Sequence, residues 1–92
     1  MVWNVIVSPQ AEDDLSNFEG AVADRVKKKL KEIRERARQG VDPDHYLKWI
    51  NKYEIHRLRI GDYRVFIDLD KEEKEINVVT VLHREDAYTG WG

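Results

Sequence analysis

The chain has 92 residues, no cysteine, 41% hydrophobic and 37% charged residues, and a formal net charge of −2. This composition predicts one globular domain over residues 1–92, and it excludes disulfide frameworks, thiolate zinc sites and cysteine nucleophiles. Apolar runs are only a few residues long and no secretory signal pattern begins the chain, so we expect a cytoplasmic protein without a membrane segment.

The first 40 residues predict a strand and two helices. Residues 2–8 are rich in β-branched and aromatic types, which favour a strand. Ser8 is a typical N-cap and Pro9 suits the first helical position, so a helix is expected to follow and to end at residues 19–20. A second helix is expected to end before Gly40, and its apolar residues recur every three or four positions: Val22, Val26, Leu30, Ile33 and Ala37. The two helices are predicted to form an antiparallel hairpin.

The remaining chain predicts mainly strands. Residues 41–46 indicate a loop and residues 47–50 a short extended piece. The later segments are a strand at 53–60, a tight turn at 61–62, a strand at 63–69 and a strand at 76–82. The order β-α-α-β-β-β indicates an α+β fold with helices packed on one face of a largely antiparallel sheet.

The charges are distributed unevenly along the chain. Residues 1–24 carry five acids and no base, residues 25–64 carry thirteen bases and six acids, and residues 65–92 carry three bases and seven acids. The local net charges are therefore −5, +7 and −4. A basic middle segment suits a polyanionic partner. A solvated basic helix balanced by acidic loops explains the same pattern equally well.

Alternation along the two central strands predicts an arginine-rich surface. Arg57 and Arg59 fall opposite the aliphatic residues of their strand, and Arg64 falls on the same side of the next strand. We expect these side chains to face solvent together, with Phe66 between them and Arg84 joining from beyond the last strand. Guanidinium groups bind phosphate bidentately, and an exposed aromatic ring can stack on an unpaired base.

Other interpretations of these residues remain open. Cross-strand salt bridges of Arg59 or Arg64 with Asp62 or Asp68 would neutralise the surface. The chain has no HExxH, CxxC, glycine-rich phosphate loop or EF-hand pattern, so neither a metal nor a cofactor is expected. His56, aligned with the aliphatic residues of its strand, is predicted to be a structural histidine.

Three stretches of the sequence together resemble the RelE/ParE toxin superfamily of prokaryotic toxin–antitoxin pairs. They are "SPQAEDDL" near the start, "RLRIGDYRVFI" at residues 57–67 and "LHREDAY" at residues 82–88. The resemblance covers essentially the whole chain. It implies a fold like that of microbial ribonucleases and a cognate antitoxin partner. RelE-like members cleave messenger RNA in the ribosomal A site, whereas ParE-like members inhibit DNA gyrase without cutting RNA.

The resemblance also implies roles for individual residues. In the RelE-like branch the matching positions that act on RNA are Arg57, Arg59, Arg64, Arg84 and Tyr88. His83 matches a late histidine that serves as acid or base in some relatives. The chain departs from the family because it is slightly acidic and because Ile55 and His56 stand where those nucleases carry lysine.

Metal-independent RNA cleavage uses the ribose 2′-OH as the nucleophile against the adjacent phosphate. Arg64 and Arg84 are expected to be exposed clamps for the developing charge, His83 to transfer protons, and Tyr88 to stack on a base or donate a proton. Alternatively, His83 is a strand-end residue held by Glu85. The predicted function is a ribosome-dependent mRNA endoribonuclease with contacts to rRNA. The alternatives are a ParE-like gyrase inhibitor and a degenerate toxin that binds only its antitoxin.

Overall fold

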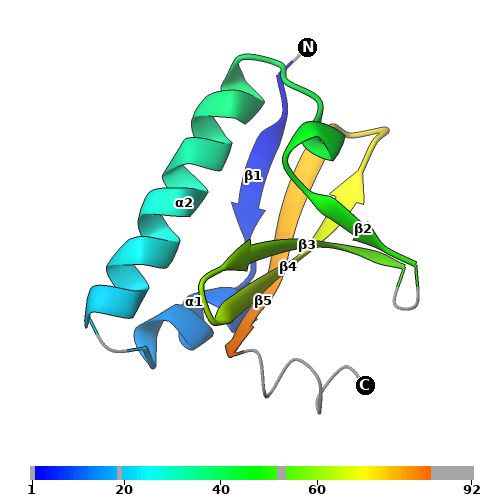
Figure 1. The fold of residues 1–92 in the computed structure, drawn as a ribbon. Coiled ribbons are helices and arrows are strands. Elements are labelled where there is room, and N and C mark those ends of the chain that lie inside the picture. The colour runs from blue at the N-terminus through cyan, green and yellow to red at the C-terminus, as the bar shows by residue number, and fades with distance from the viewer. Residues whose placement is uncertain (1, 19, 52–53, 84–92) are drawn as a thin grey trace.

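The computed structural model describes residues 2–18, 20–51 and 54–83. A single five-stranded sheet with the strand order β1-β5-β4-β3-β2 forms the centre of the fold (Figure 1). In chain order the elements are β1 (Asn4–Val7), α1 (Pro9–Ser16), α2 (Gly20–Arg38), the 3-10 turn η1 (Pro43–His45), β2 (Lys48–Ile50), β3 (Ile55–Ile60), β4 (Tyr63–Asp70) and β5 (Glu75–His83). Only the β1–β5 pairing is parallel in this sheet. The predicted α+β class and largely antiparallel sheet are confirmed.

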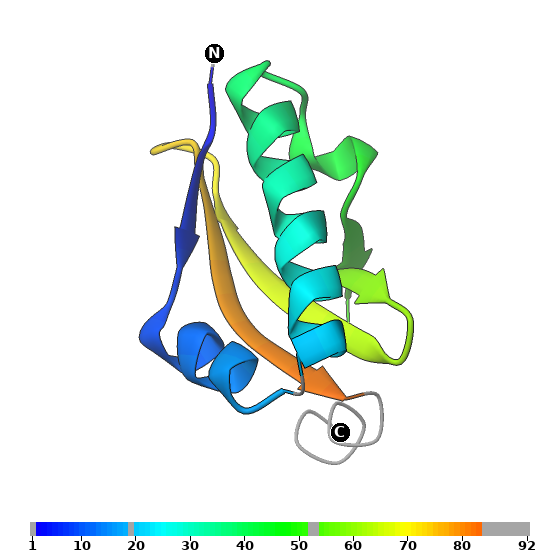
Figure 2. The same ribbon diagram turned by 90° about the vertical axis from the view of Figure 1, so that its left-hand side faces the viewer.

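Both helices contribute to one hydrophobic core on one face of the sheet (Figure 2). The Ser8 hydroxyl accepts a hydrogen bond from the Ala11 amide at 3.1 Å, as an N-cap does, and donates one to the Val79 carbonyl at 2.7 Å. Gly40 follows the second helix with φ +80°, in the left-handed region that suits glycine after a helix. The helix boundaries predicted from capping residues are therefore close to those observed.

The core forms where the apolar stripe of α2 meets the alternating aliphatic residues of the sheet. Leu58, Val65 and Ile67 point toward the helices, as the alternation predicted. The other buried members include Val26, Leu30, Ile33 and Ala37 from α2, and Ile76, Val78 and Val81 from β5. Neither helix described is long and apolar enough to cross a membrane.

A bulge and an acidic side chain shape the end of β5. Phe66 pairs with Thr80 whereas Ile67 pairs with Val78, so Val79 is an extra residue in β5. The parallel partner β1 has already ended at Val7. Beyond this point the Asp14 carboxylate accepts hydrogen bonds from the Thr80 hydroxyl at 2.6 Å and from the Val81 amide at 2.9 Å. Helix α1 thus satisfies a backbone donor that would otherwise lack a partner at the sheet edge.

Candidate anion-binding face of the sheet

The face of the sheet turned away from the helices carries a cluster of basic side chains. Paired residues of antiparallel strands point to the same side. Arg57 pairs with Lys48 and with Phe66, and Arg59 pairs directly with Arg64. We call these five residues the cationic face. Lys48 was not among the residues predicted to belong to it, because its strand has only three residues and gives little alternation to interpret.

The basic groups of the cationic face are not neutralised within the described part of the chain. Arg59 and Lys48 are exposed and Arg57 is half-buried. The ion pairs found among residues 2–18, 20–51 and 54–83 are Lys29–Glu32, Arg38–Glu35, His56–Asp44 and Lys71–Asp44. The alternative of cross-strand salt bridges with Asp62 or Asp68 is therefore wrong. Like charges placed opposite each other destabilise a sheet, so this face favours an external anion.

Arg64 does not point freely into solvent. It is 5% exposed, and its Nη1 atom donates hydrogen bonds to the carbonyls of Gly61 at 3.0 Å and of Tyr63 at 3.1 Å. Its buried Nε atom has no hydrogen-bond partner in the residues described. The prediction that Arg64 is exposed is wrong. Alternation gives the side of the sheet on which a residue lies, whereas the carbonyls of the adjacent turn draw this guanidinium back toward the backbone.

Phe66 is also covered rather than presented to solvent. It is 3% exposed and forms a small apolar cluster with Ile55, against which Val79 and Leu82 pack. The bulge explains this arrangement, since the extra residue of β5 places an aliphatic side chain beside the ring. Stacking on an unpaired base requires an open ring face. The predicted exposed stacking surface at Phe66 is therefore wrong.

His83 lies on the opposite side of the sheet from the arginines. It pairs with Tyr63, and the two rings meet edge-on with centroids 5.2 Å apart. The Tyr63 ring in turn contacts Phe18, at 4.7 Å between centroids, on the helix-covered side. Without the extra Val79, strand alternation would turn position 83 toward the cationic face. Arg84, Glu85 and Tyr88 lie outside the described residues.

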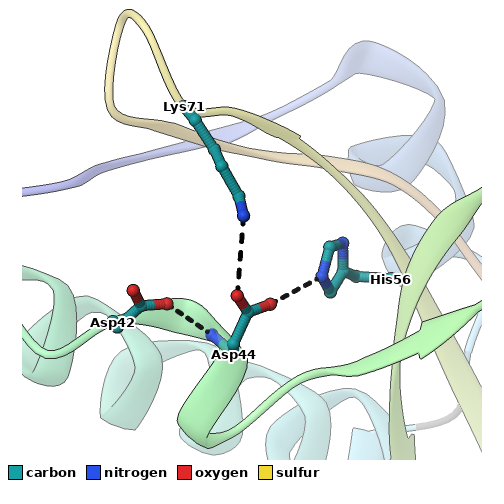
Figure 3. A network of polar contacts seen from close by, with 4 residues as sticks. All are labelled: Asp42, Asp44, His56 and Lys71. Atoms are coloured by element: carbon teal, nitrogen blue, oxygen red, sulfur yellow. Dashed lines mark hydrogen bonds and ion pairs between the residues drawn. The ribbon is translucent and has the colours of Figure 1, made fainter.

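A second polar cluster joins the η1 turn to the sheet (Figure 3). His56 is buried, as predicted for a structural histidine, and its Nε2 lies 3.0 Å from Oδ1 of Asp44. The other carboxylate oxygen of Asp44 lies 3.6 Å from the Lys71 ammonium. The hydrogen bond from His56, together with the positive charge of Lys71, lowers the pKa of Asp44 below its ordinary value of 3.8. This cluster fastens the loop after α2 to strand β3.

A groove of about 670 Å³ lies between α1, β1 and α2. Val7, Leu15 and Leu30 supply apolar lining, and the groove is rimmed by a row of basic side chains from α2, with Glu12 and Glu35 as acidic members. The basic members are Lys27, Lys31, Arg34 and Arg38. The sequence indicated a basic middle segment suited to a polyanionic partner, but it did not predict the groove, because the apolar lining of the groove comes from three separate elements.

Residues 5–88 match the family model described as the ParE toxin of the type II toxin–antitoxin system parDE. The chain belongs to this family. It is therefore a type II toxin of the RelE/ParE superfamily, and the predicted relationship is confirmed. Comparison with curated proteins gave no match.

Solved structures of RelE proteins share the fold of this toxin. One is the RelB–RelE antitoxin–toxin complex of Methanococcus jannaschii, with 26% identity over 90% of this chain and 94% of that chain and a TM-score of 0.69. Another is the RelBE2 toxin–antitoxin complex of Mycobacterium tuberculosis, with 20% identity over 91% of this chain and 100% of that chain and a TM-score of 0.71. A third is a double arginine-to-alanine variant of E. coli RelE in the free state, with 18% identity over 99% and 93% and a TM-score of 0.70. The toxin thus has a RelE-like fold.

Proposed function

We propose that this toxin is an endoribonuclease that cleaves messenger RNA on the ribosome, and that it holds the RNA backbone on its cationic face. The observation that carries the proposal is the group of four basic side chains on one side of the sheet with no carboxylate partner among the described residues. Arginine is suited to this role because its planar guanidinium matches a phosphate and stays charged at any physiological pH.

The proposed reaction is attack by the ribose 2′-oxygen on the adjacent phosphorus, with departure of the 5′-oxygen. Negative charge develops on the non-bridging phosphate oxygens, and arginines held on rigid strands stabilise it without reorganising. Arg59 and Arg57 are accessible for this purpose, while the buried Arg64 fixes the hairpin that carries Arg59. The clamp role of Arg84 and the acid or stacking role of Tyr88 stay predictions. The position of His83 beside Tyr63 argues against proton transfer by this residue on the cationic face.

Expression of the toxin in growing cells, followed by primer extension on a reporter messenger RNA, tests the proposal. We expect discrete cuts within codons. We expect them to disappear in the Arg59→Ala variant, because that side chain is exposed on the cationic face and forms no ion pair among the described residues. Arg38→Ala is the matched control, since Arg38 is an exposed arginine at the far end of α2. An intact message in cells whose growth the toxin arrests would refute the nuclease.

Inhibition of DNA gyrase is the second candidate function, and two observations favour it. The matching family model is that of the ParE toxin. Among the described residues, the cationic face holds no histidine or carboxylate placed for proton transfer. Gyrase-linked DNA breaks with intact message would support this function. A toxin that does not affect growth at all would instead be the degenerate form that retains only antitoxin binding.

We also propose a cognate antitoxin partner and a cytoplasmic location, where both candidate targets are found. The solved structures with the same fold include complexes of RelE with RelB. An amphipathic antitoxin segment with an acidic face would suit the groove beside α2, whose lining is apolar and whose rim is basic. Replacing Lys31 and Arg34 by glutamate should prevent co-purification with the antitoxin, whereas Lys48→Glu, on the other side of the sheet, should not.

A further inference from the structure

The tip of the β3–β4 hairpin is contacted by an arginine from α2. Gly61 lies in this turn with φ +58°, and a Cβ atom built on it would lie 3.0 Å from Nη2 and 3.8 Å from Cζ of Arg25. In both ribbon views the hairpin turn lies beside the first turns of α2 (Figures 1 and 2). The absence of a side chain at Gly61 therefore leaves room for the Arg25 guanidinium to approach the backbone of the turn.

Two more arginines lie at the same turn, on the cationic face. Arg64 donates hydrogen bonds to the carbonyls of Gly61 and Tyr63, and Arg59 is its partner across the hairpin. Guanidinium groups from α2 and β4 thus reach the backbone of one tight turn, and a third arginine, Arg59 of β3, is paired with Arg64 next to it. Arg25 was not among the residues predicted from the sequence to bind RNA, because nothing in the helical pattern indicates contact with a turn thirty-six positions later.

These positive charges have no counter-ion in the described chain. Arg25 is exposed and forms none of the ion pairs found among the described residues, and Asp62, the acidic residue of the turn, forms none either. The Nε atom of Arg64 is buried without a hydrogen-bond partner in the same residues. Arg25 and Arg64 both approach Gly61 without a carboxylate partner, so their like charges repel, and an anion bound at the tip would offset this repulsion.

We propose that Arg25 is a phosphate-binding residue that extends the cationic face around the hairpin tip, so that RNA contacts the toxin on both sides of the turn. This inference rests on the proposed RNA-binding function and adds a contact outside the sheet. Arg25 would bind a phosphate other than the one held by Arg59, because α2 and the cationic face lie on opposite sides of the sheet. Asp62 lies beside this path, and its carboxylate should weaken RNA binding.

Fluorescence anisotropy with a labelled single-stranded 2′-O-methyl RNA tests the inference, because this RNA keeps its phosphates and lacks the nucleophile for cleavage. We expect Arg25→Ala to weaken binding about fivefold and to lower the slope of log K against log salt by about 0.7, the value for one phosphate contact on a single strand. Arg25→Lys should keep the slope, and Asp62→Asn should tighten binding. Arg36→Ala, at an exposed arginine in the last turn of α2, is the control and should change neither quantity. Thermal unfolding of each variant verifies that it is folded.

The outcomes separate the inference from the proposed function. If the wild type binds this RNA and Arg59→Ala weakens binding, but Arg25→Ala has the wild-type affinity and salt slope, the role of Arg25 is refuted and the cationic face stands. If the wild type does not bind the RNA even at low salt, both the RNA-binding function and the inference fail. Equal losses of affinity for Arg25→Ala and Arg36→Ala would indicate only the general charge of α2, and would also refute a site at the turn.

Discussion

Replacing Arg64 by alanine is expected to destabilise the toxin, although the side chain belongs to the candidate site. The guanidinium is buried, and its Nη1 atom donates hydrogen bonds to two carbonyls of the hairpin turn. Alanine would remove both hydrogen bonds and the packing of the side-chain stem against the sheet. The sequence predicted an exposed Arg64 side chain, and the loss of an exposed side chain would leave the fold unaffected.

The expected loss follows from the contacts. A hydrogen bond from a charged donor contributes about 1.5–3 kcal/mol, so two such bonds contribute at most about 6 kcal/mol. Burial of the unpaired Nε costs about 1–3 kcal/mol, and desolvation of the charge costs more, so alanine also removes unfavourable terms. We expect a net destabilisation of about 2 kcal/mol. For a domain of this size that lowers Tm by roughly 10 °C and the urea midpoint by about 1.5 M.

Urea unfolding followed by tryptophan fluorescence measures this difference. Arg59→Ala is the matched control, because Arg59 is the cross-strand partner of Arg64 but is exposed. Its free energy of unfolding should change by less than about 0.5 kcal/mol. An Arg64→Ala midpoint equal to that of the wild type would refute the structural role. Loss of toxicity in Arg64→Ala alone is therefore poor evidence for catalysis, and Arg59→Ala is the better test.

Three further predictions concern other features of the fold. Because His56 lowers the pKa of Asp44, the ionised carboxylate stabilises the fold above pH 3.8 and loses this effect as pH falls through the lower folded-state value. Asp44→Asn should therefore be less stable than the wild type at pH 7, by under about 1 kcal/mol for this half-exposed group. The difference in urea midpoint should shrink as pH falls below 3.8, and a difference that stays constant would contradict the linkage. Tyr46→Phe should unfold at the same or a higher urea concentration, because the buried Tyr46 hydroxyl has no partner among the described residues, and a loss of about 1 kcal/mol would reveal an unseen hydrogen bond. Gly61→Ala should lower the free energy of unfolding by about 1–2 kcal/mol, because alanine is strained at φ +58° and its Cβ contacts Arg25. Thermal unfolding measures this loss, and an unchanged Tm would show that the turn adapts.

Much of the fold is encoded in local patterns. The helices were predicted close to their observed bounds because their signals involve residues only a few positions apart. These signals are the N-cap at Ser8, Gly40 after α2 and the three-to-four spacing of the apolar residues in α2. Alternation likewise gave the correct side of the sheet for Arg57, Arg59 and Arg64. The family was also predicted from short motifs, and the match of residues 5–88 to the family model confirms it.

The candidate site was predicted less well because it depends on contacts between distant segments. The bulge at Val79 shifts the alternation of β5, so that His83 lies toward the helices and Phe66 is covered. No residue pattern in β5 predicts this bulge. Burial of Arg64 depends on the turn that precedes it. Lys48 and Arg25 join the site from a three-residue strand and a helix, where sequence spacing carries no information about the hairpin.

The hydrogen bonds from β5 to Asp14 also bear on self-association of the toxin. An open strand edge can pair with the same edge of a second molecule and begin aggregation. Here the Asp14 carboxylate accepts the hydrogen bond of the Val81 amide beyond the end of β1, so this amide is not available to an incoming strand. The outermost strands, β1 and β2, have only four and three residues, which offers a short template for pairing. Asp14→Ala should therefore increase light scattering by concentrated toxin as well as loosen helix α1.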